Sequence, residues 1–563
     1  NQGALGELTE INFKNTMLKT AGTPLVVLGD ATFAGANVLD VTESFEVEGV
    51  ADVKSGSLTT GKAAFKAGTL ELGDKLGGAE LTELTASSVK VTGNSTVSGT
   101  NNTVNASAFS TNSLLLNETG ALTATGSVTA TSADLKGGSI SAKALGIGEL
   151  VLSGANTIST DTGATVTGDV SLVEGVSLGV NRGKFAAGAN VTVASGAELH
   201  VADALTVKGT LTLVSSDFKK DNFVVGTLKV GEKLAFEGNS FEDGVYAFGT
   251  STSALNSAYD VSLTNANVEY ESQLQGVGKT TLDQAHLTLA NDNASSLGEV
   301  IEMTPPSGSG KSRNLLTLTS ENGFNEIGGN FSVKGASPED VIELSGSGAV
   351  TFSQNNPFGD EYAGWIRMTG TSLDLTQTLD PDLSFSVGTG GTIALSGDQS
   401  ITLKRLGWAK PTDENGGTLD LSSFDFSNLA NDEAAISVDG LTVDGKGVIK
   451  LDQSAVSGLS TSGGSDGESI FDAANKADGE IKVIATKSPT AQSGWIDVVL
   501  DGVSGNLSAL EGFFNADGTY TTDSEAAAAK GTWNYGTAFE DDGLYVTHTL
   551  TEVELLADKT LEL

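Results

Sequence analysis

The chain has 563 residues, with 71 acidic against 31 basic side chains and a formal net charge of −40. Such a charge repels phosphate backbones, so nucleic acid is not an expected partner. The absence of cysteine excludes a disulfide framework and thiolate metal sites, and no run of about 18 apolar residues exists that could cross a bilayer as a helix. We therefore expect no membrane insertion by this chain.

Strand and turn residues dominate the composition, with 71 glycines and only 8 prolines. Hydrophobic residues make up 38% and the mean hydropathy is −0.01, which is too apolar for a disordered chain. Aromatic residues make up only 6%, so the core is expected to be aliphatic and repetitive. The composition therefore favours a long all-β fold.

The first 27 residues are predicted to form an N-terminal cap region, because the exposed first coil of a repeat fold needs a cap or a partner. The chain begins at Asn1 rather than at a methionine. We expect a mature, exported protein from which a signal segment has been removed.

Residues 28–300 carry the strongest signal, a repeat of short apolar-x-apolar triplets. Their starts lie 8, 6 and 6 residues apart, so three short strands close one coil in 20 residues. The triplets of this coil are Val191-Thr192-Val193, Leu199-His200-Val201, Leu205-Thr206-Val207 and Leu211-Thr212-Leu213.

Successive coils repeat this spacing, so equivalent triplets are expected to stack as a ladder. The triplets starting at Leu150, Val170, Val191 and Leu211 begin 20, 21 and 20 residues apart. Because strand side chains alternate between faces, the outer two residues of each triplet point inward and the middle residue points outward. The sequence predicts an all-β, right-handed parallel β-helix (β-solenoid) with three short strands per coil, forming an elongated rod.

Residues 301–563 are predicted to continue the β-solenoid with loop insertions, toward a C-terminal region that is absent from this chain. Every tryptophan lies in this half, at Trp365, Trp408, Trp495 and Trp533. Glycine and proline predict loops at 304–310, 355–357 and 462–467. The alanine-rich stretch 524–530 predicts a short surface helix capped by Asp523 or Ser524.

The last residues, Gly543 to Leu563, resemble a segment of bacterial autotransporter (type V secretion) passenger domains of the β-helical adhesin type. They contain the segments G-L-Y-V, L-T-E-V-E-L and D-K-T-L-E-L. In that family such segments form strands that follow one another in the β-helix. The resemblance implies an extracellular location at the bacterial cell surface. It also implies association with the outer membrane where a C-terminal barrel is attached.

Candidate chemistry is sparse, and we predict no catalytic, cofactor-binding or metal-binding residues and no cofactor. The protease members of the family carry a G-D-S-G nucleophile motif, which does not occur here. His200, His286 and His548 occupy middle or flanking positions of strand triplets and are expected to face solvent. A Ser/His/Asp triad is not supported.

Polysaccharide-active β-helix enzymes require clustered aspartates with a basic residue, and the chain offers few arginines. In a chain with 71 acidic residues, carboxylates near an arginine or near each other are expected by chance. The arginines are Arg182, Arg313, Arg367 and Arg405; the carboxylates considered are Asp203 after Arg182, Asp425 after Arg405, and the Asp380-Pro381-Asp382 pair.

Two glycine-rich stretches imitate ligand-binding motifs. Residues 308–312, Gly-Ser-Gly-Lys-Ser, lack the first glycine of a phosphate-binding loop, since Pro305 stands there. Residues 463–467 resemble a calcium-binding nonapeptide only once, where calcium sites need successive repeats.

The sequence therefore favours an extracellular structural or adhesion protein, not an enzyme, that associates with copies of itself in aggregates, biofilm, filaments or a surface coat. One alternative is a binding module for a host glycan or matrix, with the four tryptophans as candidate contacts unless loops bury them. A polysaccharide-active β-helix enzyme, centred on Asp380 and Asp382, is the other. A purely structural stalk is compatible with the same features.

Overall fold

A computed structural model describes most of the chain. The described ranges are 10–19, 24–73, 81–117, 119–214, 220–238, 245–255, 258–270, 274–289, 297–304, 314–321, 324–327, 332–375, 379–408, 415–429, 433–443, 445–452, 479–486, 495–501, 510–517, 520–521 and 523–561.

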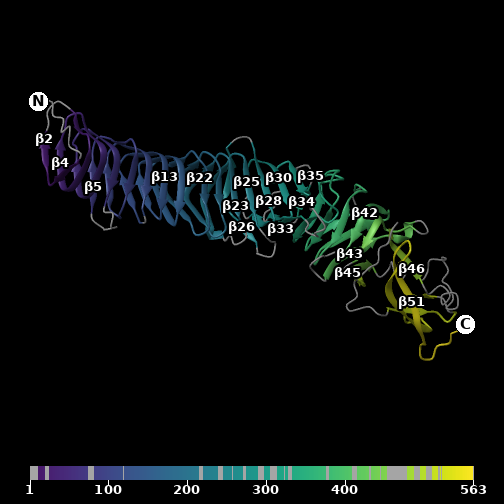
Figure 1. The fold of residues 1–563 in the computed structure, drawn as a ribbon. Coiled ribbons are helices and arrows are strands. Elements are labelled where there is room, and N and C mark those ends of the chain that lie inside the picture. Colours follow the sequence, from purple (N-terminus) through teal and green to yellow (C-terminus); the bar gives the residue numbers. More distant parts are fainter. Residues whose placement is uncertain are drawn as a thin grey trace. The chain divides into compact units, whose positions relative to one another are not determined.

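The chain divides into two compact units. The first contains residues 1–286 and 296–298, and the second contains residues 287–295 and 299–563. Both are built from β-strands, and the only helices among the described residues are the short 3₁₀ turns η1 and η4 (Figure 1). The predicted all-β parallel β-solenoid is confirmed.

The first unit is a stack of parallel strands, most of them in a single 22-stranded sheet. Its strands are β1 (Glu10–Lys14), β2 (Met17–Lys19), β3 (Leu25–Val27), β4 (Asp30–Asp40), β5 (Ser44–Thr59), β6 (Ala64–Leu72), β7 (Thr82–Thr85), β8 (Val89–Val91), β9 (Asn94–Val97), β10 (Asn102–Asn105), β11 (Ala108–Leu116), β12 (Ala121–Ala124), β13 (Ser127–Lys136), β14 (Ser139–Ala142), β15 (Ala144–Ser153), β16 (Ala155–Thr160), β17 (Ala164–Val166), β19 (Ser177–Arg182), β20 (Phe185–Ala187), β22 (Glu198–Val207), β24 (Phe223–Val230) and β27 (Ser251–Ala254).

The remaining elements of this unit complete the coils after about residue 170. They are β18 (Val170–Leu172), β21 (Val191–Val193), β23 (Thr210–Val214), η1 (Lys220–Asn222), β25 (Lys233–Glu237), β26 (Tyr246–Phe248), β28 (Tyr259–Thr264), β29 (Asn267–Tyr270) and β30 (Val277–Asp283).

One coil shows how the repeat predicted from the sequence is realised. Val191 of β21 pairs with Leu211 of β23 one coil later, and with Val170 of β18 one coil earlier. The two triplets between them form the two ends of β22. The outer residues of all four triplets are buried, with at most 1% of their surface exposed, while His200 is exposed. The predicted register and side-chain alternation are confirmed here.

The interior of the first unit is filled by aligned side chains from successive coils. Phe13 stacks on Phe33 with ring centroids 5.0 Å apart, and Phe45 and Phe65 extend this aromatic column. At one corner the buried Asn156 accepts hydrogen bonds from two backbone N–H groups of the preceding coil and donates to two carbonyls. Polar corners and apolar faces thus hold one coil on the next.

The second unit contains a seven-stranded parallel sheet, a second sheet and several longer connections. Its elements are β31 (His286–Leu289), β32 (Val300–Thr304), β33 (Leu315–Ser320), β34 (Phe324–Ile327), β35 (Ser332–Lys334), β36 (Val341–Gly346), β37 (Ala349–Phe352), β38 (Trp365–Thr369), β39 (Ser372–Asp374), β40 (Ser384–Val387), β41 (Thr392–Gly397), β42 (Ile401–Gly407), β43 (Asn415–Phe424), η4 (Phe426–Asn428), β44 (Ile436–Thr442), β45 (Lys446–Asp452), β46 (Gly479–Thr486), β47 (Trp495–Asp501), β48 (Leu510–Phe514), β49 (Tyr520–Thr521), β50 (Ala529–Glu540) and β51 (Gly543–Leu555).

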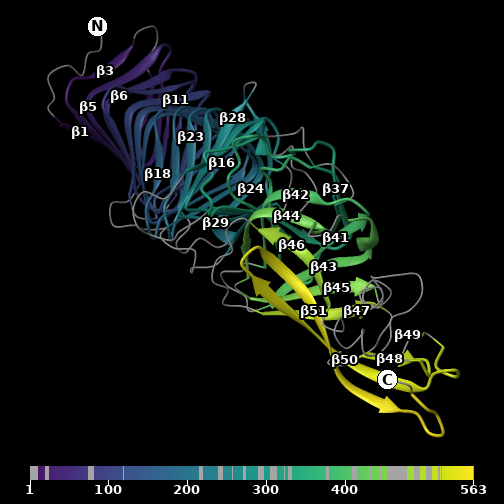
Figure 2. The ribbon, with the colours of Figure 1, turned by 90° about the vertical axis from the view of Figure 1, so that its right-hand side faces the viewer.

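The C-terminal segment differs from the expectation drawn from the family resemblance. Its first two motifs lie in one strand, β51, which pairs antiparallel with β46 and β50 instead of adding successive parallel strands (Figure 2). Gly543 lies so close to β46 that a Cβ atom there would stand 2.3 Å from the Ile484 carbonyl oxygen. The close approach of the two backbones explains the glycine of the G-L-Y-V segment.

The predicted helix at 524–530 is wrong. Asp523 does act as a cap, since its Oδ1 accepts hydrogen bonds from the N–H groups of Glu525 and Ala526. The turn then leads into β50 at Ala529, and Ala527, Ala528 and Ala529 are all buried. Tertiary burial overrides helix propensity here. The loop at 355–357 is confirmed as a turn, whereas 305–310 and 462–467 lie outside the described residues.

Candidate functional site

The outer faces of the first unit carry long rows of small uncharged side chains. One row, which we call the Ser171 ladder, contains one residue from each successive coil, and only Ala235 in it is buried. Its members, in register, are Ser171, Thr192, Thr212, Ala235, Ser262 and Thr281.

A second row lies on a different face of the same coils, and we call it the Ser110 ladder. None of its residues is buried. Its members, in register, are Ser110, Thr129, Gly146, Thr165, Ala186 and Thr206, and the row ends where Thr206 pairs with Lys229.

Charged residues flank the Ser171 ladder, both within its strands, at Lys233, Glu237 and Asp260, and in the turns. The Asp169 carboxylate accepts hydrogen bonds from the backbone and side-chain N–H groups of Asn190 at 3.0 and 3.1 Å. Asn190 in turn accepts from the N–H of Thr210 at 2.9 Å. Beside the ladder, Val173 is 56% exposed. The middle of this face is therefore uncharged, with an apolar side chain at its margin.

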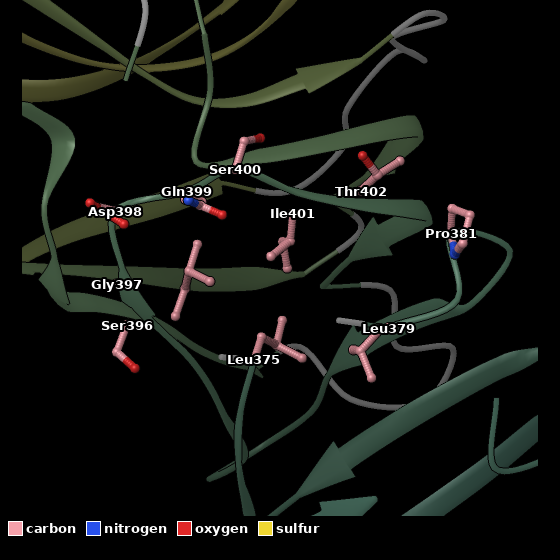
Figure 3. Close-up of a pocket in the computed structure, with 11 residues that line it drawn as sticks. Leu375, Leu379, Pro381, Ser396, Gly397, Asp398, Gln399, Ser400, Ile401 and Thr402 are labelled. Atoms are coloured by element: carbon pink, nitrogen blue, oxygen red, sulfur yellow. The ribbon is translucent and has the colours of Figure 1, made fainter. Parts of the chain in front are cut away.

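A half-open groove of about 630 Å³ lies in the second unit, beside the strands β39, β41 and β42. Figure 3 shows Leu375, Leu379 and Ile401 around the same space, with Ser400 and Thr402 at its rim. Leu375 is buried at 1% exposure, while Leu379 and Ile401 are partly exposed. Among the described residues that line the groove there is no aromatic side chain. The groove therefore has an aliphatic floor and a hydroxyl-rich rim.

The carboxylates near this groove have structural partners. Asp380 Oδ1 accepts the N–H of Asp382 at 2.9 Å, and the N–H of Leu383 donates to the Asp380 carbonyl. This is the geometry of a β-turn with Pro381 at its second position. At the rim, Asp398 accepts a hydrogen bond from Asn428. The Asp-Pro-Asp pair predicted as the best carboxylate candidate is thus engaged in shaping a turn.

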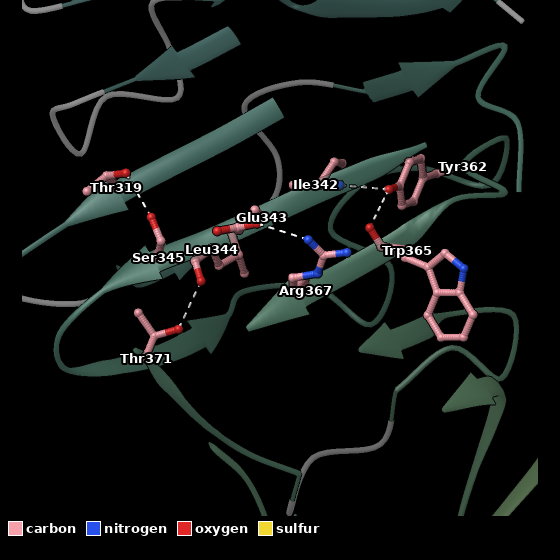
Figure 4. A network of polar contacts seen from close by, with 9 residues as sticks. All are labelled: Thr319, Ile342, Glu343, Leu344, Ser345, Tyr362, Trp365, Arg367 and Thr371. Atoms are coloured by element: carbon pink, nitrogen blue, oxygen red, sulfur yellow. Dashed lines mark hydrogen bonds and ion pairs between the residues drawn. The ribbon is translucent and has the colours of Figure 1, made fainter. Parts of the chain in front are cut away.

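A network of polar groups lies on β36 and β38 of the second unit (Figure 4). The Tyr362 hydroxyl accepts the N–H of Ile342 at 3.0 Å and donates to the Trp365 carbonyl at 2.6 Å. Burial raises the pKa of Tyr362 well above its ordinary value, so the hydroxyl stays protonated. Arg367, only 6% exposed, pairs with Glu343 at 3.3 Å.

Arg405 ties the connection before β38 to the outer face of the sheet. Its guanidinium donates to the carbonyls of Ala363 and Gly364, its Nε donates to Ser384, and it lies 4.4 Å from the centre of the Trp365 ring. Burial lowers its pKa from the usual arginine value, but the charge persists at any physiological pH. All of these contacts are structural.

The other predicted site residues are dispersed. Arg182 forms an ion pair with Asp161. Asp203 accepts a hydrogen bond from the N–H of Gly183, and Asp425 accepts one from the Asn428 side chain. Exposed His200 contacts the Asp221 carbonyl at 2.6 Å, and His286 begins β31. His548 lies in β51, but its side chain is outside the described part. No catalytic triad is formed among the described residues.

The tryptophans predicted as possible ligand contacts do not form an exposed cluster in the described part. Trp408 is fully buried and donates from Nε1 to the Gly417 carbonyl at 2.9 Å, and Trp365 is partly covered by Arg405. The side chains of Trp495 and Trp533 lie outside the described part, as do Arg313 and the stretches 308–312 and 463–467. Within the described ranges no group of three or more His, Asp or Glu side chains could hold a metal ion.

Comparison with protein-family models, with curated proteins and with solved structures found no match. Within the described residues, no helix has the length and apolar character needed to cross a membrane.

Proposed function

We propose that this protein is an extracellular structural and adhesion protein that associates with copies of itself through the outer faces of its coils. The Ser171 ladder is the observation that carries the proposal. Solvent-exposed protein surfaces normally carry interspersed charged residues that oppose association. In a chain with a net charge of −40, the ladder places none on the middle of the face.

The chemistry of the ladders suits contacts between identical faces. Neighbouring strands in a sheet lie about 4.8 Å apart, so two such faces present matching rows of hydroxyl groups at the same spacing. Each contact is weak, but the contacts repeat along the row and add up. The tail resemblance to autotransporter passengers supports a bacterial cell-surface location and an autotransporter origin as parts of the same proposal.

The groove in the second unit favours a second candidate function, the binding of a glycan or matrix ligand. Its hydroxyl-rich rim around Ser396, Ser400 and Thr402 could contact sugar hydroxyls. The described residues that line it include no aromatic platform of the kind that commonly accompanies such sites. Asp380 and Asp398 are already hydrogen-bonded to neighbouring groups, so a polysaccharide-active enzyme has less support.

Bead aggregation tests the proposed self-association. Protein-coated beads should clump, and the double variant Thr192→Glu with Thr212→Glu should strongly reduce clumping, because it places four opposing carboxylates between two Ser171 ladders. The double variant Thr129→Glu with Thr165→Glu tests the Ser110 ladder in the same way.

The control carries the same added charge in turns, at Thr162→Glu with Ser195→Glu, and should clump like the wild type. Clumping that survives both ladder variants, or an absence of clumping by the wild type, would exclude association through these faces. Binding of the wild type to a glycan or matrix array without clumping would favour the groove instead.

A further inference from the structure

The first described strand of the first unit has one edge that no other described strand pairs with. Among the described residues, β1 pairs only with β4, in parallel, from Glu10 opposite Asp30 to Lys14 opposite Ala34. Figure 2 shows β1 at the purple end of the stack, next to β3 and β5. An unpaired strand edge presents backbone N–H and C=O groups that can accept another strand.

Backbone geometry shows which groups point to that edge. The N–H of Asn15 donates to the Ala34 carbonyl of β4. Because backbone groups alternate along a strand, those of Ile11 and Phe13 also face β4, and those of Glu10, Asn12 and Lys14 face the open edge. The Lys14 N–H contacts the Thr16 hydroxyl there, at the end of the strand.

The sequence of β1 is complementary to itself when read in the opposite direction. In an antiparallel pair centred on Asn12, Glu10 stands opposite Lys14 and Ile11 stands opposite Phe13. The exposed row then contains two pairs of opposite charge. On the inner side, Phe13 is buried at 6% exposure while Ile11 is only partly covered. A second β1 would cover that exposed apolar surface.

We propose that β1 is a homodimerisation edge, at which two copies of this chain join their first coils as an antiparallel β1–β1 pair around a two-fold axis at Asn12. The outward backbone groups of Asn12 would form a hydrogen-bonded pair across the axis, flanked by the Glu10 N–H donating to the Lys14 carbonyl. The Lys14 N–H, which donates to the Thr16 hydroxyl in the single chain, would exchange that partner for the Glu10 carbonyl. Such a contact uses the same surface on both copies, so it closes at a dimer and forms no filament.

A second copy fits this edge better than other occupants because of charge. Two chains of net charge −40 repel each other, yet the contact strand carries one acidic and one basic residue that meet their opposites. The proposal deepens the proposed self-association and rests on it for its role. The contact surface itself is separate from both ladders.

Sedimentation equilibrium of the full chain with Thr192→Glu, Thr212→Glu, Thr129→Glu and Thr165→Glu removes both ladder contacts and leaves the end contact. We expect a monomer–dimer equilibrium between about 1 and 100 µM. Adding Asn12→Pro should abolish the dimer, because it removes an N–H that faces the open edge while β1–β4 hydrogen bonding continues. Circular dichroism checks that the fold is retained.

Charge reversal gives a test that no folding defect can imitate. Glu10→Lys alone and Lys14→Glu alone should each weaken the dimer about tenfold, since two attractive pairs become repulsive. The double variant should restore wild-type affinity, and mixing the two single variants should give a heterodimer tighter than either homodimer.

Several results would overturn the proposal. One is a strictly monomeric chain in the ladder background. Another is slow amide exchange at Asn12 in the monomer, which would show that another part of the chain covers this edge. A third is a dimer that survives Asn12→Pro. Loss of bead clumping in the ladder variant with a persistent β1 dimer would leave both ideas intact. Clumping that persists at the wild-type level in the ladder variants, while the β1 dimer also persists, would remove the ladder proposal without affecting this one.

Discussion

The two units are built from the same kind of strand but are stabilised differently. In the first unit, equivalent side chains such as Val170, Val191 and Leu211 stack in register, and their ion pairs lie at the surface. In the second unit the connections are longer, and polar groups such as Arg405 and Tyr362 tie distant segments to the sheet. Regular stacking needs no unique anchor, whereas an irregular coil does.

The two units should therefore differ in how much a substitution lowers their stability. In a repeat array each coil interacts mainly with its neighbours, so a single defect is local and its cost is shared by few contacts. Anchors that join segments far apart in sequence concentrate stability in a few side chains. We expect substitutions at the anchors of the second unit to cost more than substitutions at equivalent surface positions of the first.

The largest expected effect is at Trp408. Trp408→Ala should lower the free energy of unfolding of the second unit by about 3–5 kcal/mol, because it leaves a cavity in a fully buried site. Gly447 lies against this ring, since a Cβ atom there would meet it at 2.8 Å. In the first unit, Val193→Ala should cost about 2 kcal/mol. Urea unfolding followed by hydrogen exchange measures the loss of unfolding free energy in each variant. Equal losses would contradict the proposed difference between the two units.

The next effect concerns two ion pairs in equivalent cross-coil positions. Glu343→Ala should destabilise the second unit by about 3 kcal/mol, because it leaves the buried Arg367 charge without a partner. Glu46→Ala removes the exposed partner of Lys66 in the first unit and should cost less than about 1 kcal/mol. Chemical denaturation of both variants checks this. A larger loss for Glu46→Ala would contradict the distinction between anchored and stacked coils.

A smaller effect is the pH dependence contributed by Asp340. Burial raises the pKa of its carboxyl above the ordinary aspartate value, against hydrogen bonds from Asn314 and Ser337 that lower it. The folded state therefore favours the protonated form, and this contribution to stability is lost as pH rises through the raised pKa.

Asp340→Asn removes this titration. Denaturant titrations of the wild type and the variant should therefore show wild-type stability falling, relative to the variant, as pH increases from the ordinary aspartate range upward. A constant difference, or a rise with pH, would show that the carboxylate is stabilised in the folded state.

The smallest effect on stability is expected on the ladders. Thr192→Glu with Thr212→Glu should change the unfolding free energy of the first unit by less than about 1 kcal/mol, because both side chains face outward. Thermal unfolding of the double variant, at a concentration below the range in which it dimerises, checks this. A large destabilisation would mean that the ladder serves packing within the coil, and the clumping test would then need milder variants such as Thr→Asn.

The same contrast between the two units explains how much of the structure could be predicted from the sequence. The triplets around Val191 and Leu211 predict strands, register and inward side chains, because period-two alternation and a 20-residue repeat determine them locally. Outward Thr192 follows from the same pattern. The ladder was thus implicit in the repeat, although its lack of charge becomes evident only when the register places one residue from each coil in one row.

The second unit could not be predicted in this way. Arg405 donates to Ala363, which lies 42 residues earlier, and no local pattern indicates that contact. The groove depends on how residues 379–381 meet residues 395–402. The alanines at 527–529 predicted a helix from propensity, whereas all three are buried and Ala529 begins a strand paired with Phe514 of β48. Long-range packing decides each of these cases.

The chain contains no cysteine, so single cysteines can report directly on the contact between copies. Thr212→Cys and Thr165→Cys place a thiol on each ladder, and Ser195→Cys places one in a turn. Under mild oxidation, our account predicts disulfide-linked dimers at one or both ladder positions, because cysteines must come within about 7 Å to bond. The turn position should remain largely unlinked. Cross-linking at neither ladder position above the level at Ser195 would contradict self-association through these faces.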